Sequence, residues 1–409
     1  MIRYLTYILT VFIIVFLHSC SAVKRGGVTA GLGAEKGLLV NPVKNEAINV
    51  LKAIVLQQAE WAMQQKPVTV TSDSSARSAG DKHDFFSEGD YWWPDPAKPS
   101  GPYIQKDGMT NPDNFVAHRL AMIRFSKIIG CLASAYRITG DKKYAVQAMV
   151  HLKAWFIDPE TLMNPNLQYA QAIRGRFTGR GIGIIDTIQL MEVAQGVIVM
   201  EKVLNAETVS GTKKWYTDYL GWLMSHPYGK AEMEALNNHG TCFVMQVASF
   251  AKLTQDIKLL DFCRDRYKNV LLPNQMATDG SFPKELARTK PYGYSIFNLD
   301  AMAAICQILS SGPGPGLENM WSYQTADGRS IKKGIEYLHP FVADKSKWPL
   351  KPDVMYWKDW PVAQPFLLFA ALAYGDKGWL ATWLKLEHDP QIEEVIRNLP
   401  LRNPLIWID

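Results

Sequence analysis

The chain has 409 residues and a formal net charge of +5, with 47% hydrophobic and 20% charged residues. This length suffices for two or three domains of average size or for one large domain. The charge is modest and no dense block of Lys and Arg is present. These features argue against a nucleic-acid-binding protein and mildly favour an acidic ligand.

The N-terminal residues resemble an export signal. Arg3 precedes an apolar run over residues 7–17, which is long enough for a signal-peptide core and too short for a membrane-spanning helix. The run ends in Leu-His-Ser-Cys, which resembles a bacterial lipobox ending at Cys20, although the histidine departs from the small residue usual there. We expect residues 1–20 to be a lipoprotein signal peptide, Cys20 to be lipidated, and residues 21–42 to be a flexible tether. An ordinary cleaved signal is the alternative.

These features predict an exported bacterial lipoprotein, periplasmic or anchored to the outer membrane. The lipid anchor is the expected membrane contact, because no later segment holds eighteen uninterrupted apolar residues. Four further cysteines lie in apolar stretches without the spacing of a zinc site, so buried thiols and a disulfide both remain open. They are Cys131, Cys242, Cys263 and Cys306.

The body of the chain, residues 43–409, has the pattern of a series of amphipathic helices. Apolar residues recur at three- and four-residue spacing, whereas alternating strand patterns are scarce. The helical stretches are 115–138, 144–155, 184–203, 215–224 and 243–253. Short turns with an Asp that can cap the next helix recur at 139–144, 254–259 and 374–379. The pattern predicts an all-α single domain in which helix pairs curl into an (α/α) toroid, with function in the loops 66–114, 164–183, 271–293 and 310–329.

Asn238 and His239 form the first half of a set suited to removing a proton next to a sugar carboxylate. Such an elimination needs a neutralised carboxylate, a base for the C5 proton and an acid for the departing oxygen. The Asn238 amide can donate to the carboxylate. His239 follows at a predicted helix start, capped by Asn237 or Asn238, where the helix N-terminus favours an anion and a neutral imidazole. Taken alone, Asn-Asn-His is also an ordinary helix start.

Arg288 and Tyr294 form the second half of the set. A phenol titrates near pH 10, and a neighbouring guanidinium favours the phenolate, so we expect Arg288 to lower the pKa of Tyr294. Tyr294 is then base and acid in turn on one face of the sugar, as syn elimination requires. For the C5 epimer, His239 is the expected base and Tyr294 the acid. Tyr292 is a rival for the catalytic role only two residues away.

Asn238-His239, the segment 285–288 (Glu-Leu-Ala-Arg) and Tyr294 together resemble the catalytic motifs of the alginate lyase superfamily, in particular polysaccharide lyase family five. That family usually places the Tyr one residue further from the Arg. The segments 91–96, 101–104, 107–108, 111–112, 168–173 and 179–186 are more similar to family thirty-eight, whose members act on alginate and glucuronan. The resemblance implies a toroid of six or seven helical hairpins. It also implies a polysaccharide lyase without a cofactor, and the donors above make a metal unnecessary.

Further residues are candidates for binding the sugar chain. Aromatic rings stack on the apolar faces of sugars, and arginines bind carboxylates in a bidentate manner, although buried packing and structural ion pairs are the respective alternatives. The aromatic candidates are Tyr91, Trp92, Trp93 and Tyr292, and the cationic candidates are Arg119, Arg174 and Arg180. Gln168, Tyr169 and Gln171 lie in a loop that can reach the groove.

Three functions are compatible with the sequence. The leading one is a lyase that cleaves 1,4-linked uronans, namely alginate (especially mannuronate-rich) and glucuronan, by metal-independent β-elimination. The second is a toroid hydrolase acting on uronides, which needs a pair of carboxylates. Available ones are Asp95, Asp186, Glu232, Glu234 and Glu285. The third is a non-catalytic glycan-binding lipoprotein, which leaves the Asn-His and Arg-Tyr set unexplained.

Overall fold

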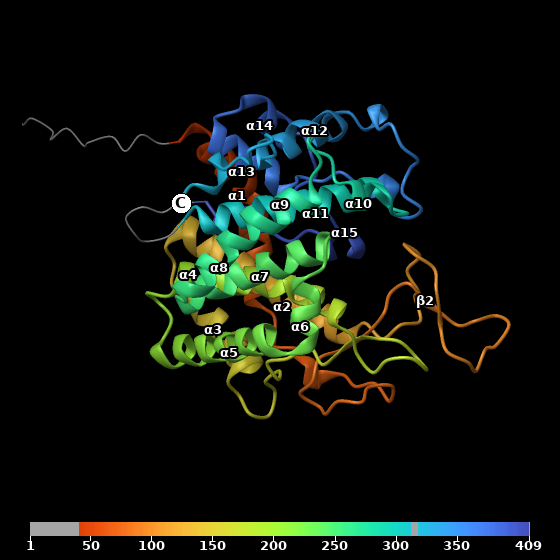
Figure 1. Cartoon of the computed structure of the whole chain (residues 1–409). Helices are drawn as coiled ribbons and strands as arrows, with labels where there is room; N and C mark the ends of the chain where they lie inside the picture. The colour runs from red at the N-terminus through yellow and green to blue at the C-terminus, as the bar shows by residue number, and fades with distance from the viewer. Residues whose placement is uncertain (1–40, 312–317, 409) are drawn as a thin grey trace, which may run out of the picture. The chain divides into compact units, whose positions relative to one another are not determined.

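The computed structural model describes residues 41–311 and 318–408, drawn in colour in Figure 1. The predicted signal peptide, the lipidation site Cys20 and nearly all of the predicted tether lie outside the described residues, so these stay predictions. Residues Asn41–Asp409 form one unit by their internal contacts. The body predicted over residues 43–409 is therefore a single domain.

Helices make up most of the described chain (Figure 1). In chain order they are α1 Pro42–Met63, α2 Ala117–Thr139, α3 Lys143–Phe156, α4 Leu190–Met200, α5 Ala206–Ser225, α6 Pro227–Met233, α7 Asn238–Thr254, α8 Ile257–Arg266, α9 Leu272–Gln275, α10 Pro283–Leu286, α11 Pro291–Leu309, α12 Ile331–Ala343, α13 Pro365–Tyr374, α14 Lys377–Trp383 and α15 Glu393–Arg397. A long 3-10 helix, η2, covers Gly181–Gln189.

The three predicted turns each join two packed helices. They connect α2 to α3, α7 to α8, and α13 to α14. Asp256 and Asp376 cap α8 and α14 through their side chains, as predicted. Gly140 and Gly375 end α2 and α13 in the left-handed conformation, with φ of 70° and 69°, which glycine adopts without steric cost. Local sequence therefore determines these helix ends.

One predicted helix differs from the expectation. The stretch 184–203 begins as η2 and becomes the α-helix α4 only at Leu190. At Gly183 a Cβ atom would lie 2.4 Å from that of Ala170, so glycine allows η2 to pass directly against strand β4 (Tyr169–Ala172). By length and composition, the combined helical stretch Gly181–Met200 could cross a membrane, and it is the one such stretch among the described residues. However, 78% of its most apolar 18-residue window is buried inside the protein, as in the core helix of a globular domain.

The core lies between packed helices, with α7 at its centre. Helix α7 contacts α4, α5, α6, α8 and α11, and α2 contacts α1, α3 and α4. Nearly every side chain of α7 is buried, including Phe243 and Phe250, which explains why its apolar residues extend around the whole helix. The four cysteines beyond Cys20 are free, buried thiols.

In the described parts of the chain, four short strands belong to the long loops. Strand β1 (Phe86–Glu88) pairs in parallel with β4, and β2 (Trp92–Trp93) pairs antiparallel with β3 (Ile104–Gln105). The β2 segment, by which we mean residues 90–107 with β2 and β3, extends away from the helices in Figure 1. These strands bring residues from two distant loops to the N-terminal ends of α7 and α11, where residues from all of these segments line one pocket.

Candidate active site

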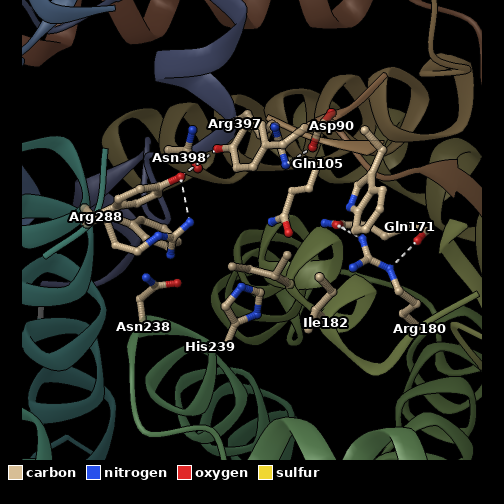
Figure 2. Close-up of a pocket in the computed structure, with 15 residues that line it drawn as sticks. Asp90, Gln105, Gln171, Arg180, Ile182, Asn238, His239, Arg288, Arg397 and Asn398 are labelled. Atoms are coloured by element: carbon tan, nitrogen blue, oxygen red, sulfur yellow. Dashed lines mark hydrogen bonds and ion pairs between the residues drawn. The ribbon is translucent and has the colours of Figure 1, made fainter. Parts of the chain in front are cut away.

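A pocket of about 640 Å³, counting its open mouth, lies where the β2 segment, η2, α15 and the starts of α7 and α11 meet (Figure 2). All four predicted catalytic residues line it. The lining residues are Asp90, Tyr91, Trp92, Gln105, Gln171, Arg180, Ile182, Ile185, Asn238, His239, Arg288, Tyr294, Phe297, Arg397 and Asn398. Residues separated by more than 300 positions in the sequence thus form one site.

Asn238 is held in place by a buried carboxylate. It is the first residue of α7, with Asn237 as the N-cap that accepts from the backbone N–H of His239. Its backbone N–H donates to Oε1 of Glu285 at 2.7 Å, and its amide Nδ2 donates to Oε2 at 2.8 Å. The second hydrogen on Nδ2 is left for another acceptor. Glu285 therefore orients an amide that can donate to a substrate carboxylate.

His239 forms a hydrogen-bonded pair with Glu232. Nδ1 of His239 lies 2.5 Å from Oε1 of Glu232, a carboxylate that is 2% exposed. Burial lowers the pKa of His239, but the charge and hydrogen bond of Glu232 outweigh it, and the net effect is a raised pKa. This direction is opposite to the one expected from the helix start alone, because Glu232 lies beside the ring. With Nδ1 bonded to Glu232, Nε2 is the nitrogen that can exchange a proton with a substrate.

Arg288 is fixed by Asp107 from the β2 segment. Nη2 and Nε of Arg288 donate to the two carboxylate oxygens of Asp107 at 2.7 and 3.2 Å, and the Thr289 hydroxyl adds a third bond at 2.9 Å. Nη2 also donates to the hydroxyl of Tyr294 at 3.3 Å, and the guanidinium lies 4.4 Å from that ring. These bonds use Nε and Nη2, so Nη1 remains to meet a substrate carboxylate.

Tyr294 is a phenol in the free protein. Its hydroxyl lies 2.8 Å from that of Tyr91. Burial raises the pKa of Tyr294 well above 10, interaction with Tyr91 raises it further, and Arg288 acts in the opposite direction. Arg288 therefore acts in the predicted direction, but the predicted net lowering of the Tyr294 pKa is wrong. The free energy needed to remove a phenolate from water exceeds the stabilisation by a guanidinium whose charge is partly neutralised by Asp107.

Arg180 is a cation available to a ligand. Its Nε donates to the carbonyl of Gln171 at 2.8 Å, and its guanidinium lies 5.7 Å from the ring of Trp92. Burial lowers its pKa to about 10. Within residues 41–311 and 318–408, no carboxylate lies at ion-pair distance from Arg180. Figure 2 shows this side chain at the opposite end of the pocket from Arg288. A uronate carboxylate is the kind of group that compensates such a charge.

Arg119 has a structural role, contrary to the prediction that it binds substrate. It is 3% exposed, does not line the pocket, and donates to Asp90 at 2.8 Å. Asp90 also pairs with Arg397. Burial raises the pKa of Asp90, but the two arginines outweigh it and the net pKa is lowered. Asp90 therefore stays ionised and holds two elements together instead of donating protons.

Tyr292 also lies outside the pocket. Its ring is completely buried against Trp348 and Trp357, and its hydroxyl donates to the carbonyl of Phe341 at 3.1 Å. Neither substrate binding nor catalysis is compatible with this position. Tyr294 is the tyrosine of this pair that reaches the pocket.

The remaining predicted binding residues are divided between the pocket and its surroundings. Tyr91 and Trp92 line it, whereas Trp93 donates through Nε1 to the carbonyl of Met109 and lies outside. Gln168 and Tyr169 do not line it either. Arg174 is exposed on a neighbouring surface hollow, 5.9 Å from the ring of Tyr103.

Several lining residues were not among the predicted site residues: Asp90, Gln105, Ile182, Ile185, Phe297, Arg397 and Asn398. Arg397 and Asn398 come from the last short helix and its end, far from any recognised motif. Gln171 was noted only as a loop residue. Its φ of 50°, rare outside glycine, directs it to Arg180, and a sequence gives no signal for such a conformation.

The carboxylates considered for a hydrolase are all engaged elsewhere. Glu232 and Glu285 lie behind His239 and Asn238 and do not line the pocket. Asp186 accepts from Ser87 in the interior, and Glu234 pairs with Arg266. Asp95 is likewise absent from the pocket wall. No two of these face each other across the pocket.

The pocket of this helical toroid combines Asn238, His239, Arg288 and Tyr294, the residues that carry the predicted resemblance to polysaccharide lyases. The protein-family model for alginate lyase matches residues 69–348, and the chain belongs to that family. The predicted resemblance is confirmed at the level of the superfamily. A search of curated protein sequences gave no match.

Solved structures agree with this assignment. An alginate lyase from Bacteroides ovatus is 32% identical, with a TM-score of 0.75 over 90% of this chain and 96% of that one. Two structures of alginate lyase A1-III complexed with tetrasaccharide are 14% and 13% identical, with TM-scores of 0.53 and 0.51. They cover 80% and 79% of this chain and 88% and 87% of theirs, and they show the fold alone. The predicted single-domain (α/α) toroid is confirmed.

Proposed function

We propose that this protein is a polysaccharide lyase that cleaves alginate, especially mannuronate-rich alginate, and also glucuronan, by β-elimination. The observation that carries the proposal is that Asn238, His239, Arg288 and Tyr294 line one pocket. Asn238 and His239 begin α7, Tyr294 lies in the first turn of α11, and Arg288 lies in the short segment between α10 and α11. The 32% identical Bacteroides ovatus alginate lyase supports alginate as the substrate.

In this mechanism the substrate carboxylate binds to the free N–H of Asn238 and to Nη1 of Arg288. Drawing charge from the carboxylate makes the C5–H bond acidic. Tyr294 first loses its hydroxyl proton to solvent at the open pocket. The resulting phenolate takes the C5 proton, the C4–O bond breaks, and a C4–C5 double bond forms. The same tyrosine, now a phenol, returns that proton to the departing oxygen. Both transfers occur on one face of the ring, as mannuronate and glucuronate require.

For guluronate the C5 proton lies on the opposite face. There His239 acts as the base through Nε2, with Glu232 balancing the imidazolium that forms, and Tyr294 acts as the acid. The raised pKa of Tyr294 suits this second role directly, because the hydroxyl is already protonated. The two routes share one set of side chains and differ in which group removes the proton.

Arg180 and Trp92 are the groups that we propose bind the neighbouring sugar. The ring of Trp92 can stack on a sugar face. The guanidinium of Arg180, which has no carboxylate partner in the described residues, lies close enough to that ring to bind the carboxylate of the same sugar. Mannuronan and glucuronan have the same C5 configuration and differ at C2. One pocket with one base can therefore act on both.

A panel of pure polymers tests the proposed function. Incubation with mannuronan, guluronan, glucuronan, hyaluronan and chondroitin sulfate is followed by absorbance of the unsaturated ends and by a reducing-end assay. We expect unsaturated ends from mannuronate-rich alginate and glucuronan, and little from sulfated chains, which demand a denser basic surface than +5 provides. Reducing ends without absorbance would indicate a hydrolase. Binding that is accompanied by neither signal would indicate a glycan-binding protein.

Chelation is expected to leave the activity intact. Asn238 and Arg288 can neutralise the carboxylate with their own N–H groups. In the described parts of the chain, no group of three or more His, Cys, Asp or Glu side chains is arranged to hold a metal ion. Rates on mannuronan should be the same before and after treatment with EDTA. A complete loss that calcium restores would contradict this account of carboxylate neutralisation.

A further inference from the structure

A second hollow, which we call the distal hollow, lies beside the catalytic pocket. It has a volume of about 780 Å³, counting its open side, which is within the range of sites that hold small ligands. Its wall includes Arg77, Glu88, Arg174, Arg176 and Phe177. None of the described residues that line it also lines the catalytic pocket, so the distal hollow is a separate feature of the surface.

Two arginines of the distal hollow carry charge that the protein does not balance. Arg174 and Arg176 are exposed, and within the described residues neither has a carboxylate at ion-pair distance. The third arginine, Arg77, pairs with Glu88 at 2.6 Å, and the same carboxylate oxygen accepts from the backbone N–H of Phe115. The lining therefore holds an excess of positive charge, which complements an anionic ligand.

Both unpaired arginines lie on a short hairpin turn whose backbone is fixed. Ile173 and Phe177 exchange two backbone hydrogen bonds, at 2.8 and 3.0 Å, and Gly175 between them has a φ of 73°, which glycine adopts without steric cost. Nε of Arg176 donates to the carbonyl of Tyr103 in the β2 segment at 2.8 Å. A cationic turn that is already held in one conformation loses little conformational entropy when a ligand binds.

The distal hollow adjoins the catalytic pocket at one end. Gln171 and Arg180 flank the hairpin turn in the sequence and line the pocket, and Figure 2 shows Arg180 at the end opposite Arg288. The guanidinium groups of Arg176 and Arg180 lie 5.4 and 5.7 Å from the ring of Trp92. A sugar chain that leaves the pocket past Trp92 therefore comes to the arginines of the distal hollow.

We propose that the distal hollow is a second binding site for the anionic polysaccharide, an inference that rests on the proposed lyase function. Arg174 and Arg176 bind carboxylates of sugars outside the catalytic pocket, and the ring of Phe177, which is 56% exposed, packs on an apolar sugar face. The site contacts no reacting atom. It increases the affinity for long chains, which occupy both sites at once, whereas oligomers that fill the catalytic pocket alone do not reach it.

The chain-length dependence of the double variant Arg174→Gln/Arg176→Gln tests this inference. The variant removes both unpaired charges and keeps polar side chains. KM on long mannuronan should rise about tenfold, whereas kcat, and KM on the shortest mannuronate oligomer that is cleaved, should keep their wild-type values. An unchanged KM on long mannuronan would overturn the proposal. An equal rise on the short oligomer would overturn it too, because the substitutions would then merely disturb the neighbouring pocket.

Lys142→Gln/Lys258→Gln is the matched control. It removes the same net charge from two exposed positions that line neither cavity. At an ionic strength of about 0.1 M, which screens charges separated by more than about 10 Å, this variant should keep the wild-type KM on both substrates. A rise equal to that of the arginine variant would attribute the effect to net charge alone and overturn the proposal. Phe177→Ala should raise KM on long mannuronan about threefold, and an unchanged value would overturn the sugar-face contact.

Direct binding separates this inference from the proposed function. Calorimetric titration with long mannuronan is carried out on Tyr294→Phe, in which the chain should not be cleaved, with and without the two arginine substitutions. The substitutions should weaken binding about tenfold, and equal affinities would overturn the distal site even if the wild-type protein is an active lyase. The proposed function fails on a different result, namely the absence of unsaturated ends from every uronan treated with the wild-type protein.

Discussion

Replacing Tyr294 by phenylalanine is expected to reduce kcat on mannuronan by about a thousandfold or more, with little change in substrate binding. The hydroxyl takes the C5 proton and returns it to the leaving oxygen, so both steps lose their proton carrier. The ring remains to fill its place beside Arg288. Initial rates from the absorbance of unsaturated ends give kcat, and calorimetric titration with a short mannuronate oligomer gives the affinity.

Tyr292→Phe is the natural control for that variant. Its hydroxyl bonds the Phe341 carbonyl in the interior, so its loss should cost about 1 kcal/mol of stability and leave kcat unchanged. A fully active Tyr294→Phe together with an inactive Tyr292→Phe would move the catalytic role to the buried tyrosine and contradict the site described above.

Replacing His239 by alanine is expected to reduce guluronan cleavage by about a hundredfold to ten-thousandfold, the range in which general acid–base groups contribute. The variant removes the proposed base and also leaves Glu232 without its buried partner. Mannuronan cleavage should fall less, because Tyr294 supplies the base there. Rates on both polymers with the same preparation give the ratio. An equal loss on both would show that His239 serves binding or carboxylate neutralisation alone.

Glu232→Gln separates the effect of the partner from that of the imidazole. Glu232 raises the pKa of His239, and a base must be neutral to accept a proton, so this pKa sets the acidic limb on guluronan. Without the charge of Glu232 the pKa falls. The acidic limb should therefore move to lower pH, and the maximal rate should decrease because the base is weaker. A limb that stays in place would exclude His239 as the titrating group.

The sequence by itself determined most of the helices and identified four residues that the structure places in one pocket. Apolar spacing, Asp caps and glycine ends depend on neighbours within a turn or two, which is why α2, α3, α7 and their turns agree with the expectation. Asn237 caps α7 for the same local reason. Asn238, His239, Arg288 and Tyr294 were selected from their residue types and from a family resemblance, without any distances, and their roles in an elimination stay a prediction.

Tertiary structure alone decided which side chains face the pocket and in which protonation state. Tyr292 and Tyr294 lie two residues apart at the start of α11, and successive helical residues turn by about 100°, so they point to opposite sides. The sequence placed both at the site, Tyr294 as the catalyst and Tyr292 as a binding candidate, and only the folded structure shows that Tyr292 is buried away from it. The same holds for two arginines. Arg119 forms a buried ion pair with Asp90, whereas Arg180 has no carboxylate partner in the described residues. The pKa values of His239 and Tyr294 depend on Glu232 and Tyr91, which folding brings close, and on burial, which no local pattern contains.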